Sequence, residues 1–229
     1  MRLLSVTLLA VACGGRSAPA SSGAPLTTTM DDHFVGLSRL RDLVIAGDLD
    51  AARQVGTTFA GGLRDQAHPD GWHPYLQDVR AGTWRAARAP DLATAAVGVA
   101  RAGVACGACH LALGVRAVSA DDEVVAARTG QLDDFMHRHR WAVDRLWIGL
   151  VAPSDAAWDI GAQALGTAGA FPLTDVLRAD PDSVTLAERL VVVGTDAAAA
   201  RAPAERAGVF AELIGACARC HRHLGDVVD

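Results

Sequence analysis

The sequence predicts an all-helical fold made of two tandem repeats. Hydrophobic residues make up 51% of the 229 residues but aromatic residues only 5%, and most of the apolar side chains are Ala, Val and Leu. This composition favours helices over sheets, and apolar residues recur every three or four positions, as on one face of a helix. The net charge of −5 and the pI of about 5.9 argue against nucleic-acid binding.

The first residues have the composition of an export signal. Residues 1–12 hold a basic start and a ten-residue apolar run, which is too short to span a bilayer and is typical of a signal peptide. Small residues precede Cys13, as in a bacterial lipobox, where this cysteine would be lipidated. An ordinary signal peptide with an incidental Cys13 is the alternative. Both interpretations predict export, and the first predicts a lipid anchor on the periplasmic side of a bacterial membrane.

The segment that follows predicts a flexible tether. Residues 13–29 are rich in Gly, Ser, Ala and Pro and show no periodicity. At its end, Thr29 and Asp32 have the spacing of a capping box, which predicts a helix start.

The repeat becomes visible when Met30 is aligned with Met136, an offset of 106 residues. A predicted helix break and N-cap then coincide, Gly47-Asp48 with Pro153-Ser154. We therefore predict about four short helices in each of two repeats, residues 30–116 and 132–229, joined by a linker over 117–131. Apolar stripes of the two first helices also correspond: Met30, His33, Leu37, Leu40 and Val44, and Met136, His139, Val143, Leu146 and Leu150.

Each repeat ends in a C-x-x-C-H motif, the attachment pattern of c-type haem. Residues 106–110 read Cys-Gly-Ala-Cys-His and residues 217–221 read Cys-Ala-Arg-Cys-His. On a helix, cysteines at i and i+3 share a face and can bond the two vinyl groups of one haem, and the histidine at i+4 reaches the iron. The sequence thus predicts two covalent haem c groups, bound by the cysteines Cys106, Cys109, Cys217 and Cys220 with the proximal ligands His110 and His221. A redox C-x-x-C or a Cys₄ zinc site is the alternative.

The second motif lies so close to the end of the chain that any distal iron ligand must come from upstream. Only eight residues follow His221, and His223 is too near it to reach the other haem face.

With this order of motifs the chain resembles the class II c-type cytochromes, the cytochrome c-prime family. The resemblance covers nearly all of residues 30–229 as two copies, each shorter than the usual family member. It implies two tandem four-helix bundles with the haem motif on the last helix, and a distal Met on the first helix, matched by Met30 and Met136. A homodimer through the first helices is a further option that it implies.

His33 and His139 are the rival distal ligands. Each shares a helix face with the neighbouring methionine, and imidazole is the stronger iron ligand. Because Met30 would fall at the frayed first position of its helix, we favour His33 and His139, with Met30 and Met136 or an open site as alternatives.

These observations predict an exported electron carrier rather than an enzyme. Two six-coordinate low-spin haems would leave no position for a substrate, so the partners would be redox proteins. A haem-based gas-binding or sensing protein, or a small dihaem peroxidase, is the alternative, and each needs one open iron site.

Overall fold

In the computed structural model, residues 26–65, 68–115, 132–166 and 175–228 are described, and within these ranges the chain forms helices and turns without a β-strand. The predicted all-helical fold is confirmed. The signal peptide, Cys13, most of the tether and the predicted linker 117–131 lie outside the described residues.

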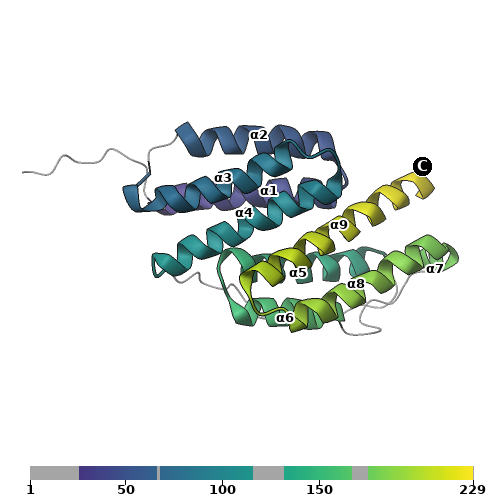
Figure 1. The fold of residues 1–229 in the computed structure, drawn as a ribbon. Coiled ribbons are helices and arrows are strands. Elements are labelled where there is room, and N and C mark those ends of the chain that lie inside the picture. The colour runs from purple at the N-terminus through teal and green to yellow at the C-terminus, as the bar shows by residue number, and fades with distance from the viewer. Residues whose placement is uncertain (1–25, 66–67, 116–131, 167–174, 229) are drawn as a thin grey trace, which may run out of the picture.

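The helices of the two halves follow the same order (Figure 1). In the first half they are α1 (Leu26–Ile45), α2 (Leu49–Asp65), the 3-10 turn η1 (Asp70–Trp72), α3 (His73–Ala87) and α4 (Leu92–Ala112). In the second half they are α5 (Leu132–Val151), α6 (Asp155–Gly166), the short α7 (Asp175–Ala179), α8 (Pro181–Ala199) and α9 (Pro203–Val228).

The predicted helix breaks are confirmed in both halves. Gly47 adopts a positive φ of 80°, which ends α1, and the Asp48 carboxylate then accepts a hydrogen bond of 2.9 Å from the Ala51 amide. In the second half the Ser154 hydroxyl accepts one of 3.2 Å from the Ala157 amide. The two caps lie 106 residues apart, as the sequence alignment of the repeats requires.

The predicted start of the first helix is wrong. Thr29 lies inside α1, which begins at Leu26. Met30 is therefore in the second turn of the helix and not at a frayed end, and one argument against Met30 as an iron ligand is removed.

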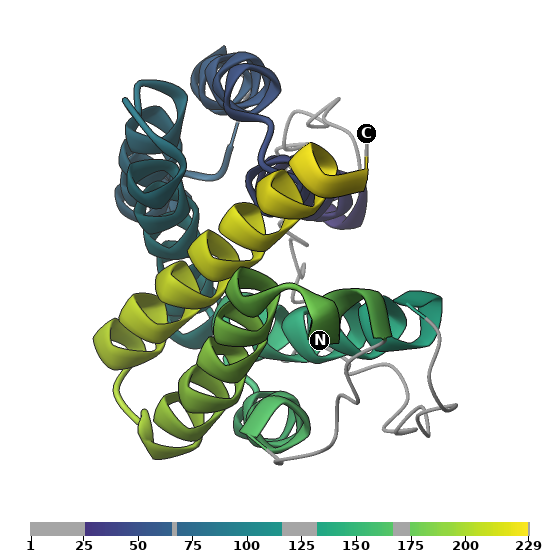
Figure 2. The ribbon, with the colours of Figure 1, turned by 90° about the vertical axis from the view of Figure 1, so that its right-hand side faces the viewer.

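The two halves share one hydrophobic core. The apolar stripe of α1, with Leu40 fully buried, and that of α5, with Leu146 fully buried, belong to the same cluster of buried residues. Trp147 of α5 stacks on Phe210 of α9, with ring centroids 5.4 Å apart. Figures 1 and 2 show α9 crossing diagonally between the helices of the first half and those of the second, where it packs on α4.

Two side-chain contacts between α1 and α5 join equivalent pairs of repeat positions, with the roles of the two helices exchanged. The guanidinium of Arg41 on α1 binds the carboxylate of Asp144 on α5, and the indole Nε1 of Trp147 on α5 donates to the hydroxyl of Ser38 on α1. Arg41 and Trp147 occupy equivalent positions of the repeat, as do Ser38 and Asp144. The interface between the halves is therefore reciprocal.

Among the described helices, α4 alone is long and apolar enough to cross a membrane by length and composition. Of the apolar window on which that test rests, 61% is buried inside the protein. Its burial against α3 and α9 accounts for its apolar character as that of a core helix.

Candidate functional site

Both C-x-x-C-H motifs lie on helices, as their spacing predicts. The first forms the last turns of α4 and the second lies within α9. The four described cysteines are free thiols. Burial, and to a smaller degree the neighbouring Cys109, raises the pKa of Cys106 to about 12. Burial likewise raises the pKa of Cys217 to about 12, with Cys220 adding to the effect. These thiols therefore stay protonated at neutral pH.

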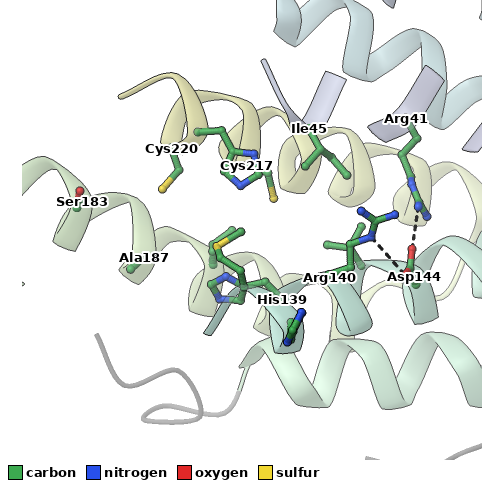
Figure 3. Close-up of a pocket in the computed structure, with 14 residues that line it drawn as sticks. Arg41, Ile45, His139, Arg140, Asp144, Ser183, Ala187, Cys217 and Cys220 are labelled. Atoms are coloured by element: carbon green, nitrogen blue, oxygen red, sulfur yellow. Dashed lines mark ion pairs between the residues drawn. The ribbon is translucent and has the colours of Figure 1, made fainter. Parts of the chain in front are cut away.

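The second motif opens onto a cavity of about 290 Å³. The cavity brings together residues of α1, α5, α8 and α9: Arg41, Ile45, Met136, His137, His139, Arg140, Val143, Asp144, Ser183, Ala187, Leu190, Cys217, Cys220 and His221. Figure 3 shows Cys217 and Cys220 on one wall and the α5 side chains His139, Arg140 and Asp144 on the opposite wall. The structure thus joins the motif to both candidate distal residues of the second half, Met136 and His139.

His139 has the properties of a neutral imidazole ligand. Its side chain is only 6% exposed. Burial, then the nearby His221 and Arg138, lower the pKa of His139 to about 3. The imidazole is therefore uncharged at neutral pH, and an uncharged ring nitrogen is the form that binds iron.

The ring of His110, the candidate proximal ligand of the first motif, is held by a hydrogen bond to the backbone. The Nδ1 of His110 lies 2.7 Å from the carbonyl oxygen of Val151 at the end of α5. Because a carbonyl only accepts, Nδ1 carries the proton, and Nε2 is left as the lone-pair nitrogen that a metal requires. The pKa of His221 is lowered by burial, and the backbone of Ile45 at the end of α1 partly offsets that lowering.

The first site differs from the second around its candidate distal histidine. The α1 helix, which carries Met30 and His33, packs against α4. The ring of His33 makes edge contacts with Phe59 and His68, at centroid distances of 6.2 and 5.3 Å, and His68 stacks on Trp72. His68 has no counterpart in the second repeat, so the repeat alignment gave no signal for its place beside His33.

The cysteines do not support the alternative of a Cys₄ zinc site. Among the described residues, the group whose ligand atoms lie within 4.8 Å of one another is Asp180, Asp182 and His223, and the four described cysteines form no such group. Within that group the Nε2 of His223 lies 2.6 Å from the Asp180 carboxylate. His223 thus binds the Asp180 carboxylate beside the start of α8.

The residues at the second site fit a covalently bound haem. They provide two thiols and an imidazole on one helix face, an apolar wall from Ile45, Val143 and Leu190, and a neutral imidazole across the cavity. The cavity volume lies just below the range of about 300–1,000 Å³ that small-molecule and cofactor sites occupy.

Comparisons with models of known protein families, with curated proteins and with solved structures found no match to this chain.

Proposed function

We propose that the protein is an exported dihaem c-type cytochrome that carries electrons between redox partner proteins. The observation that carries the proposal is the occurrence, twice, of C-x-x-C-H on a helix, with the histidine of the first motif hydrogen-bonded to a backbone carbonyl. Neither zinc binding nor a disulfide requires that histidine. When bound, haem c supplies one-electron cycling of its iron, and the protein supplies ligands, burial and orientation.

Each residue of the second site has a definite role in this proposal. Cys217 and Cys220 would hold the haem covalently through two thioether bonds. His221 would supply a ring nitrogen as the proximal ligand. His139 supplies the distal nitrogen and Met136 is the alternative donor, since both line the cavity.

At the first site Cys106, Cys109 and His110 take the same roles, with His33 as the distal candidate and Met30 as its alternative. The contacts of His33 with Phe59 and His68 fix its ring within an aromatic cluster. Binding iron would require this ring to leave the cluster or to bind from within it, so the two haems are expected to differ in their spectra.

We also propose a class II, cytochrome c-prime-like relationship for each half. It is supported by the helix order and by the motif on the last helix of each half. Cys13 would carry the lipid anchor on the periplasmic side of the membrane. A homodimer belongs to the same proposal as an option to be tested by the mass of the complex in solution.

The experiment is to produce the full chain in a host that attaches haem c and to record ferric and ferrous absorption spectra before and after carbon monoxide is added. Two low-spin haems that do not take up carbon monoxide support the electron carrier. A high-spin haem that takes it up contradicts a pure carrier, and turnover of hydrogen peroxide by such a haem would identify a peroxidase. The variant Cys13→Ser should release the protein from the membrane fraction without changing the spectra.

A further inference from the structure

Each proximal histidine is held by the half of the chain that does not contain it. His110 belongs to the first half, but its Nδ1 donates to the carbonyl of Val151, the last residue of α5 in the second half. His221 belongs to the second half, and the last residue of α1 in the first half, Ile45, raises the pKa of His221 through its backbone. Ile45 also lines the cavity together with His221.

The two contacts join residues at equivalent positions of the two repeats. Ile45 and Val151 are equivalent at the offset of 106 residues that aligns the first helices, and His110 and His221 are equivalent in the two motifs. The contacts of Arg41 with Asp144 and of Trp147 with Ser38 pair the two halves in the same way, at equivalent positions.

The acceptors are chemically suited to tune a ligand. The last four carbonyls of a helix have no donor within the helix, and the C-terminal end carries partial negative charge. A ring N–H that donates to such a carbonyl makes the opposite nitrogen more basic and fixes the ring orientation. A more basic ligand stabilises ferric iron and lowers the reduction potential.

We infer that the two halves exchange the supports of their proximal ligands, so that the end of α5 orients and tunes the first haem and the end of α1 orients and tunes the second. This inference rests on the proposed function. It makes Val151 and Ile45 positioning residues, and it makes the two haem centres a single structural unit rather than two independent modules.

Substitution of Gly107 can test the contact between His110 and Val151. A Cβ at this position would lie 2.4 Å from the carbonyl oxygen of Leu150, beside Val151, so Gly107→Ala must push α4 away from the end of α5. Ala108→Ser is the matched control, because Ala108 is the exposed residue of the same motif. Gly47→Ala is the reciprocal variant, since a Cβ there would lie 2.6 Å from Arg222 Cγ and 3.3 Å from the Ala218 carbonyl oxygen, on α9 beside His221.

The experiment is a spectroelectrochemical titration of the full haem-loaded chain, resolved into two components. We expect Gly107→Ala to raise the potential of one component, Gly47→Ala to raise that of the other, and Ala108→Ser to move neither. Unchanged potentials in both glycine variants, or equal movement of both components in each, would overturn the inference.

A second measurement on the wild-type chain needs no variant to fold. In NMR spectra of the haem-loaded protein, the Nδ1 protons of His110 and His221 should both exchange slowly with solvent. Rapid exchange of either proton contradicts the inference. Failure of the proposed function is distinguishable, since a chain without haem is recognised from its mass before any potential is measured.

Discussion

The guanidinium of Arg41 lies 2.7 Å from the carboxylate of Asp144, and this ion pair joins the first helix of one half to the first helix of the other. Arg41 is only 4% exposed and also binds Asp42 at 2.7 Å, whereas Asp144 is 40% exposed. A charge buried to this extent depends on its partners, because it cannot be solvated by water. The pair lies at the wall of the cavity (Figure 3), so it links packing between the halves to the second site.

Replacing Arg41 by Met should lower the free energy of unfolding by about 2 kcal/mol, since it removes charge-assisted hydrogen bonds from a buried position. Arg140→Met is the matched control. Arg140 binds the same carboxylates but is 63% exposed, so its loss should change the free energy by less than about 0.5 kcal/mol. Urea titrations of both variants measure the difference. Equal effects would show that the contribution of the Arg41–Asp144 ion pair to the free energy of unfolding does not depend on the burial of Arg41.

The sequence predicted the helices and their buried faces but not their partners. Leu37, Leu40 and Val44 are buried as the stripe of α1 predicts, because periodicity identifies which face of a helix avoids water. It does not identify what covers that face, and the crossing of α4 and α9 could not be inferred from either half alone. The start of α1 was misplaced because Thr29 and Asp32 have a capping-box spacing that the chain does not use as a helix end.

Under the proposed function, His139→Leu should convert the second haem from low-spin to high-spin and allow it to take up carbon monoxide. The buried, neutral imidazole of His139 is the strongest distal donor on the cavity wall. Met136→Leu should leave the haem low-spin, and so should His137→Leu, an exposed neighbour on the same helix. Electron paramagnetic resonance and carbon monoxide titration report the spin state. A high-spin haem in Met136→Leu alone would assign the distal position to the methionine.

The cap of α2 should be worth about 1 kcal/mol, the usual contribution of an N-cap side chain. Asp48→Ala removes the acceptor of the Ala51 amide, and Ser154→Ala does the same for Ala157 on α6. Thermal unfolding followed by circular dichroism measures both losses. Asp48→Asn retains an acceptor and should restore most of the stability, and failure of that rescue would contradict the capping role.

Protonation of Asp180 should lower the stability of the protein in acid. Its hydrogen bonds with Ser183 and then His223 lower the pKa of Asp180 to about 2. A carboxyl with a depressed pKa stabilises the fold above its unfolded pKa of about 4, and this contribution is lost as the pH falls from there to about 2.

Asp180→Asn keeps a good N-cap for α8 and removes only the charge. The variant should be less stable than wild type at neutral pH, and the difference should shrink below pH 4. Asp182→Asn, an exposed neighbour, is the control, and urea midpoints measured at each pH give the comparison. A difference that stays constant down to pH 2 would contradict the assignment.

The sequence predicts the local motifs of the candidate site but not the contacts that these motifs make with distant segments. The spacing of cysteines and histidine within five residues is a local property, so both motifs could be identified from the sequence and both lie on helices. The acceptor of the His110 ring is distant in sequence, 41 residues away at Val151, and nothing local predicts it. His68 was missed beside His33 because its loop is not repeated.

The most direct test of the dihaem assignment is the intact mass of the denatured protein after production with the haem-attachment machinery. We expect the mass of the processed chain plus two haem groups, and plus one haem group in the double variants Cys106→Ser/Cys109→Ser and Cys217→Ser/Cys220→Ser. A chain that carries no haem under these conditions would contradict the dihaem assignment.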